Sequence, residues 1–82
     1  MKYAELYAMR IRQLCDAKGI TINRLATLAG LKQSTISNIM LGTSLNPKVR
    51  TLHRIAVVFN MTLSEFLDFP ELNEYSIDDE EE

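Results

Sequence analysis

The 82-residue sequence predicts an all-α fold of five helices, and three observations support this fold class. Apolar residues recur at spacings of three and four, which is the period of a helix that buries one face. Glycine or asparagine follows the expected helix ends, and threonine or asparagine precedes several beginnings. The stretch 21–42 contains two short helical patterns separated by one glycine, which is typical of a helical hairpin.

The first expected helix covers residues 3–18. Its apolar face consists of Tyr7, Ile11 and Leu14, with Cys15 beside them. Gly19 is the expected C-terminal cap, because glycine readily takes the left-handed conformation at a helix end. One cysteine cannot form an internal disulfide, and with the single histidine it cannot complete a zinc site. We therefore expect Cys15 to be a core residue without catalytic or redox chemistry.

The stretch from residue 21 to residue 42 predicts a short helix, a tight turn and a second short helix. Thr21 is the expected N-cap, since a hydroxyl there accepts a hydrogen bond from a free backbone N–H. Leu25, Ala26 and Ala29 share one face of the first of these helices. Gly30 then breaks the pattern and supplies the left-handed backbone angle that the turn needs.

The second helix of this hairpin begins at Lys32 or Gln33, ends before Gly42 and has two unlike faces. The face expected to be buried consists of Ile36, Ile39 and Met40. The opposite face carries Gln33, Ser34, Ser37 and Asn38. These short, uncharged side chains both donate and accept hydrogen bonds. Such a face suits base edges in the major groove of DNA, where Gln and Asn can each form two hydrogen bonds with adenine.

The chain after Gly42 predicts a loop and two further helices. Asn46 and Pro47 are expected to cap and begin a fourth helix over about residues 48–59. The side chains expected to be buried on it are Val49, Leu52, Ile55, Ala56 and Phe59. Asn60 can end it in the left-handed conformation. A capping box from Thr62 to Glu65 then begins a short fifth helix, which we expect Pro70 to end.

Charge is segregated along the chain, although the formal net charge is only −2. Residues 1–60 contain nine basic and two acidic residues, a net charge of +7, whereas residues 61–82 contain nine acidic residues and no basic one. The first part has the charge of a phosphate-binding surface. Residues 71–82 are expected to be an acidic, disordered tail, because the acids at 78–82 repel one another. Docking of 71–77 as a short arm is the alternative.

As one ordered set, these features resemble the Cro/C1-type helix-turn-helix regulators, the Xre family. The matching residues are Leu25-Ala26, Gly30-Leu31, Ser34-Thr35-Ile36-Ser37, Gly42, Asn46-Pro47, Leu52, Ile55-Ala56, Thr62-Leu63 and Phe66-Leu67. The resemblance covers about residues 8–68. It implies a compact five-helix, lambda-repressor-like DNA-binding domain at residues 1–70, with the helix-turn-helix formed by its second and third helices.

The resemblance also implies which residues touch DNA. The expected base-reading residues are Gln33, Ser34, Asn38 and Lys32. The expected backbone contacts are Thr21, Asn23, Ser37, Thr43, Asn46, Lys48, Arg10 and Arg12. Family members often carry glutamine where this chain has Ile22, which cannot hold a phosphate. Many also have an arginine–glutamate pair at the positions of Cys15 and Met40, which apolar packing can replace.

The sequence therefore predicts a transcriptional regulator that binds double-stranded DNA, acts as a repressor and forms a homodimer. The candidate dimer surface consists of Leu45, Val57, Val58 and Met61. No catalytic residue, metal, cofactor or small-molecule ligand is expected, because the chain has no Gly-rich phosphate loop, metal-ligand cluster or nucleophile–base pair. Without an apolar run of about 18 residues or a signal core, we expect a cytoplasmic protein that does not enter the membrane.

A protein-interaction module is the alternative function. Such an antitoxin-like or anti-repressor protein would keep the fold but bind DNA weakly, since a fold alone does not determine function. Ile22, the poor helix cap at Lys32 and the acidic tail favour this alternative.

Overall fold

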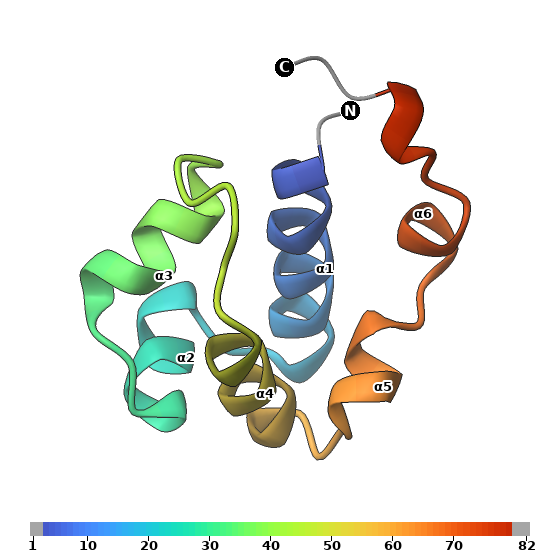
Figure 1. Ribbon diagram of the computed structural model, residues 1–82. Coiled ribbons are helices and arrows are strands. Elements are labelled where there is room, and N and C mark those ends of the chain that lie inside the picture. Colours follow the sequence, from blue (N-terminus) through green and yellow to red (C-terminus); the bar gives the residue numbers. More distant parts are fainter. Residues whose placement is uncertain (1–2, 80–82) are drawn as a thin grey trace.

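Six α-helices and one 3-10 turn make up the computed structural model, which describes residues 3–79. The elements are α1 (Tyr3–Lys18), α2 (Ile22–Ala29), α3 (Gln33–Met40), α4 (Val49–Val58), α5 (Leu63–Leu67), α6 (Pro70–Asn73) and η1 (Ile77–Asp79). α1 runs through the middle, with α2 and α3 on one side and α5 and α6 on the other (Figure 1). The predicted all-α class is confirmed, and α2 and α3 are the two helices of the predicted hairpin.

One apolar core joins the first five helices. Ile11, Leu25, Ile36, Ile55 and Phe66, one from each helix, are all 0% exposed. Burying each such side chain stabilises the fold by about 1.5–3 kcal/mol. The short helix α5 would be unstable alone, so its Phe66 anchor is what holds it on the core.

Cys15 is a core residue, as predicted. Its side chain is 2% exposed, and burial raises the pKa of its thiol. A buried, protonated thiol is unreactive. Met40 is partly buried against the same cluster. Apolar packing therefore occupies both positions at which the resemblance places an ion pair.

Capping interactions fix the beginnings of α2 and α5 as the sequence indicated. The Oγ1 atoms of Thr21 and Thr62 accept hydrogen bonds from the backbone N–H groups of Arg24 and Glu65, each at 3.0 Å. The Thr62 backbone N–H donates to Glu65 Oε1 at 2.8 Å, which completes the predicted capping box. Asn60 has a φ of 56°, the predicted left-handed conformation after α4.

Two expectations about the start of α4 are wrong. Lys48 rather than Asn46 is the N-cap, so Pro47 precedes the helix instead of beginning it. Lys48 stays extended, with a ψ of 143°, as the loop from α3 reaches α4. Val49 is 67% exposed rather than buried. It is the first residue of α4, whose buried residues begin one turn later at Leu52.

The segment after α5 contains a further short helix. α5 ends at Leu67, and Pro70 begins α6 instead of ending α5. α6 contacts α1, and the Tyr75 ring centroid lies 5.5 Å from that of Tyr3. These contacts favour the docked arm over the disordered tail for residues 71–77. The domain boundary at residue 70 stays a prediction, and residues 80–82 of the expected tail lie outside the described chain.

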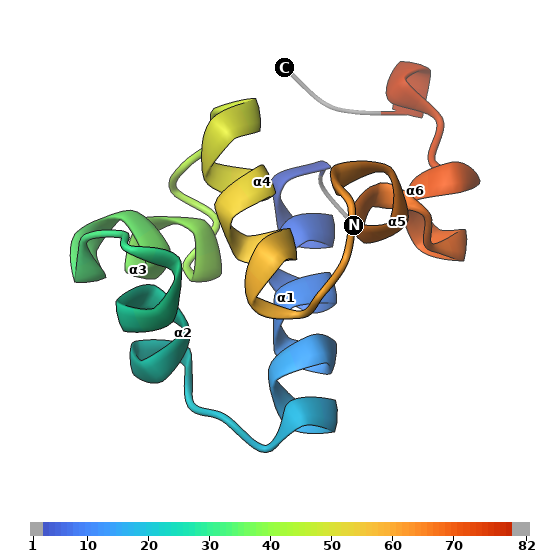
Figure 2. The same cartoon turned by 90° about the horizontal axis from the view of Figure 1, so that it is seen from below.

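Arg10 ties this C-terminal segment to α1. Its Nε donates to the Phe66 carbonyl at 3.0 Å, and its Nη2 donates to the Glu65 carbonyl at 3.1 Å. Its guanidinium also lies 5.1 Å from the centroid of the Phe69 ring. A cation at the last carbonyls of α5 satisfies groups that a helix end leaves free. Its guanidinium is thus bonded to α5, which lies on the other side of α1 from α3 (Figure 2). The expected phosphate contact of Arg10 stays a prediction, and it would require these bonds to break.

Candidate nucleic-acid interface

The turn between α2 and α3 positions the candidate interface. Gly30 has a φ of 69° and a ψ of 32°, as the predicted left-handed turn requires. Its N–H donates to the Thr27 carbonyl at 3.2 Å, and the Leu31 N–H donates to the Ala26 carbonyl at 2.9 Å. These bonds satisfy the last carbonyls of α2. The direction of α3 relative to α2 is therefore fixed by a short, hydrogen-bonded turn.

α3 has the two unlike faces that the sequence predicted. Ile36 and Ile39 are buried at 0% and 2% exposure. Gln33, Ser34, Ser37 and Asn38 are exposed on the opposite face. Because the isoleucines hold α3 against the core, the polar face has one orientation toward solvent. Lys32, the N-cap of α3, is also exposed and makes no side-chain cap bond.

Both amide side chains of this face have neighbours that restrict them. Gln33 Nε2 donates to the Asn23 carbonyl in the first turn of α2 at 3.1 Å. The Thr43 hydroxyl donates to the Asn38 backbone carbonyl at 3.1 Å and to its Oδ1 at 3.4 Å. These exposed bonds are weak enough to exchange for base contacts, at about 0.5–1.5 kcal/mol each. Without DNA, these bonds hold the Gln33 and Asn38 side chains near the surface of α3.

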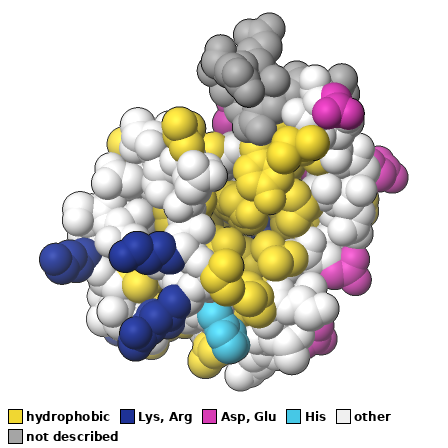
Figure 3. Space-filling view, in the orientation of Figure 1, with side chains coloured by type: hydrophobic (Ala, Val, Ile, Leu, Met, Phe, Trp, Pro, Cys, Tyr) yellow, Lys and Arg dark blue, Asp and Glu magenta, His cyan; other side chains and the backbone are white. Residues whose placement is uncertain are grey.

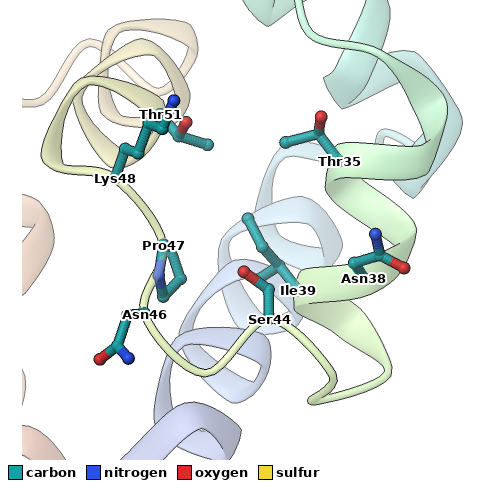
Figure 4. A pocket seen from close by; sticks show the side chains of 8 residues that line it. All are labelled: Thr35, Asn38, Ile39, Ser44, Asn46, Pro47, Lys48 and Thr51. Carbon is teal, nitrogen blue, oxygen red and sulfur yellow. The ribbon is translucent and has the colours of Figure 1, made fainter.

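A polar hollow of about 300 Å³ separates α3 from the start of α4 (Figure 4). It is lined by Thr35, Asn38, Ile39, Ser44, Asn46, Pro47, Lys48 and Thr51. Hydroxyl, amide and ammonium groups from α3 and from the following loop thus share one rim. Such groups are the usual hydrogen-bond donors to phosphate oxygens in DNA complexes.

The other expected backbone contacts occupy both flanks of α3. Thr21 and Asn23 are exposed at the start of α2, and Thr43, Asn46 and Lys48 are exposed in the loop that follows α3. Ile22 is partly buried against the core. The side chain that replaces the family's glutamine therefore packs inward and leaves Asn23 as the polar neighbour. Arg12 is exposed on α1.

The sequence interpretation missed two surface residues beside this interface. Arg54 Nη1 donates to the Ala29 carbonyl at 3.4 Å, so an α4 side chain closes the end of α2. Leu41, directly after α3, is 75% exposed. The sequence signal for this exposure was the position of Leu41 directly before Gly42, beyond Ile39, the last buried residue of α3.

The four candidate dimer residues do not share one surface environment. Leu45 and Val57 are 64% and 61% exposed, whereas Val58 and Met61 pack partly buried against the core. Hydrophobic side chains form a band across the face seen in Figure 3, with basic side chains on one side and acidic ones on the other. On this face, the charge segregation of the sequence is thus also a segregation in space.

Two features are absent from residues 3–79. No group of three or more His, Cys, Asp or Glu side chains that could hold a metal ion occurs there. Within the same residues, no helix is both long and apolar enough to cross a membrane.

A short helix, a glycine turn and a second helix with a buried apolar face and an exposed polar face define a helix-turn-helix protein. A helix-turn-helix family model matches residues 11–66 of the chain. The chain belongs to this family, in its Cro/C1-type (Xre) branch, as the resemblance implied. The family binds double-stranded DNA and regulates transcription.

Similar proteins include named regulators and one solved structure. The chain is 29% identical over 70 residues to the HTH-type transcriptional regulator SinR of Bacillus subtilis (strain 168), covering 85% of this chain and 63% of SinR. It is 34% identical over 62 residues to the HTH-type transcriptional regulator PuuR of Escherichia coli (strain K12), covering 76% of this chain and 33% of PuuR. The crystal structure of the prophage Lp1 protein 11 matches with a TM-score of 0.81 and 36% identity, covering 92% of this chain and 100% of that one.

A prophage protein of similar length is also a relative. The SPbeta prophage-derived uncharacterized HTH-type transcriptional regulator YopS of Bacillus subtilis (strain 168) is 30% identical over 59 residues, which cover 72% of this chain and 80% of YopS. By contrast, the chain spans less than two thirds of SinR and one third of PuuR. These matches therefore concern the helix-turn-helix part of those two regulators.

Proposed function

We propose that this protein represses transcription as a homodimer and reads a specific DNA sequence by placing α3 in the major groove. The observation that carries the proposal is the exposed polar face of α3, held outward by the buried Ile36 and Ile39. Gln33, Ser34, Asn38 and Lys32 are the proposed base-reading residues. Side chains of this kind can tell one base pair from another in the major groove.

Phosphate contacts on both sides of α3 would set its depth and register in the groove. On one side they come from Thr21 and Asn23 at the start of α2. On the other side they come from Ser37, Thr43, Asn46 and Lys48, beside the polar hollow. Arg12 belongs to this set as an exposed cation of α1. Arg10 would belong to it only if the bonds of its guanidinium to α5 broke.

The central experiment measures binding to DNA from upstream of the protein's own gene, against scrambled DNA, by fluorescence anisotropy across salt concentrations. Gln33→Ala is expected to reduce affinity for the specific site by about tenfold to a hundredfold, because one bidentate base contact contributes about 1–3 kcal/mol. Its affinity for scrambled DNA is expected to stay unchanged.

Lys48→Met provides the matched contrast to Gln33→Ala. Losing a phosphate contact should weaken binding to both DNAs alike and lower the slope of log affinity against log salt by about one. Specific binding that is unaffected by Gln33→Ala would contradict base reading by α3.

Repression and dimer formation are separate parts of the proposal. A bound protein would repress by covering a promoter, which in vitro transcription from the bound fragment can test. Two copies would read half-sites about 34–36 Å apart. Leu45 and Val57 are the exposed apolar side chains offered for the dimer contact. Leu45→Asp should shift the protein toward monomer in sedimentation equilibrium.

A protein-interaction module on the same fold is the second candidate function. The inward packing of Ile22 favours it, because the family's phosphate-holding side chain is missing at that position. This alternative predicts weak DNA binding that does not discriminate between sequences and does not respond to Gln33→Ala.

A further inference from the structure

A second hollow lies on the exposed side of α4, outside the proposed DNA interface. It has a volume of about 240 Å³ and is lined by Arg50, His53, Arg54 and Val57. Figure 3 shows the histidine of the chain, His53, between basic and hydrophobic side chains. Val57 supplies an exposed apolar part of its lining, and the two arginines supply positive charge. The hollow therefore fits an apolar side chain that is flanked by carboxylates.

Among the most exposed apolar side chains of residues 3–79, one has that chemistry. The large apolar side chains exposed there are Leu28, Leu41, Leu45, Val49, Val57 and Ile77. Among these residues, Ile77 alone is followed directly by an acid, Asp78, and it has Glu74 three positions before it. Ile77 is 69% exposed. In Figures 1 and 2, η1 lies well away from α4, so the hollow and the Ile77 turn of one molecule do not meet.

We propose that the hollow on α4 binds the Ile77–Asp78 turn of a second copy of the chain. The Ile77 side chain would cover Val57, and the carboxylates of Asp78 and Glu74 would face Arg50 and Arg54. This contact names a surface for the proposed self-association and rests on that part of the proposed function, but it does not require DNA binding by α3. It is small, so the association belongs with weak, salt-sensitive interfaces.

The test is sedimentation equilibrium of the full chain without DNA, at about 50 mM and about 500 mM salt. Ile77→Asp is expected to weaken self-association at least about tenfold at the lower salt, because an apolar anchor is replaced by a charge. Leu41→Asp, directly after α3, is the matched control, since it places the same charge at an exposed leucine that does not line the hollow. Circular dichroism checks that each variant is folded.

Charge reversal separates a direct contact from an indirect effect. Arg50→Glu and Asp78→Arg should each weaken self-association, and an equimolar mixture of the two variants should restore it as a mixed pair. A purely structural role for either residue would not give this rescue. If Leu45→Asp disrupts the dimer while Ile77→Asp and the charge reversals leave it intact, this contact is wrong and the homodimer stands. A protein that is monomeric at every concentration would overturn both.

Discussion

Single side chains in this protein have roles that depend on which backbone groups lie near them. Arg10 and Arg12 are two residues apart on α1, yet Arg10 binds the carbonyls of α5 and Arg12 is exposed. Glu65 is exposed but bonded to the start of its own helix through the Thr62 N–H. Side chains of one type therefore need not share a function, even when they are neighbours in sequence.

Glu65 is expected to make the stability of the fold depend on pH. The hydrogen bond from the Thr62 backbone N–H favours the carboxylate and lowers the pKa of Glu65 from its ordinary value of 4.5. A lowered folded-state pKa means that the stabilisation is fully present above pH 4.5 and is lost as the pH falls through the lowered value. Urea unfolding of the wild type and Glu65→Gln should therefore differ by a constant amount at higher pH. The difference should shrink in acid, and one that is equal at pH 6 and pH 3 would refute this role.

Arg10 is also expected to stabilise the fold. Arg10→Met keeps the aliphatic stem but removes both hydrogen bonds to α5, so unfolding should require about 1.5–3 kcal/mol less free energy. Arg12→Met, at an exposed position, should change stability by less than about 0.5 kcal/mol. Denaturant titration of both variants tests the contrast. Equal effects would show that the α5 contact contributes nothing, and a change in the salt slope of DNA binding by Arg10→Met would return this residue to the DNA interface.

The ends of the helices decide how neighbouring elements of this fold are joined. α2 ends at Gly30 in the left-handed conformation, and Arg54 of α4 donates to the Ala29 carbonyl just before it. A Cβ atom added at Gly30 would lie 3.2 Å from Arg54 Nη1. The turn that orients α3 therefore depends on a glycine and on the helix packed beside it.

Gly30→Ala should destabilise the protein more than Gly19→Ala. Both glycines have a positive φ, of 69° and 74°, so alanine at either position incurs a strain of about 1–2 kcal/mol. Only at Gly30 must a neighbouring side chain also move, because nothing lies within 4 Å of a Cβ at Gly19. Thermal or urea unfolding would show the difference. Adding Arg54→Met should make the two glycine substitutions alike, and a persisting gap would point to another cause.

Charge is segregated along the chain and, on the face shown in Figure 3, also across the surface. All basic residues lie at or before Arg54 in the sequence. The charged residues of α5, α6 and η1 are all acidic. Because α6 contacts α1 on the side opposite α3 (Figure 1), this acidic segment has a set place relative to α3. An acidic segment at a set place favours DNA-bound orientations in which α3 faces the duplex and disfavours the reverse.

Neutralising the acidic segment should strengthen non-specific DNA binding. The double variant Asp68→Asn, Glu71→Gln removes two negative charges from exposed positions that take no part in the proposed self-association contact. Affinity for scrambled DNA should rise several-fold at low salt and converge with wild type near 1 M salt, where the Debye length is about 3 Å. Anisotropy titrations test this. A gain that persists at high salt would mean that the acids act by direct contact rather than by long-range repulsion.

Much of this protein follows from local sequence alone. The period of the apolar residues predicted α1 to α5, and Thr21, Gly30, Asn60 and Thr62 predicted how several of them begin or end. These features depend on contacts between residues within about one helical turn, so they can be predicted from the local sequence. The faces of α3 were predictable for the same reason, because Ile36 and Ile39 alternate with the polar residues at the helical period.

Only the tertiary structure decided what happens between distant segments. The clamp of Arg10 on α5, the closure of α2 by Arg54 and the docking of α6 with Tyr75 against Tyr3 join residues 25 to 72 positions apart. Val49 fits an apolar period yet is 67% exposed, because none of the elements within residues 3–79 covers it. Periodicity states which residues share a face of a helix. What lies against that face depends on how the helices pack, which local sequence does not contain.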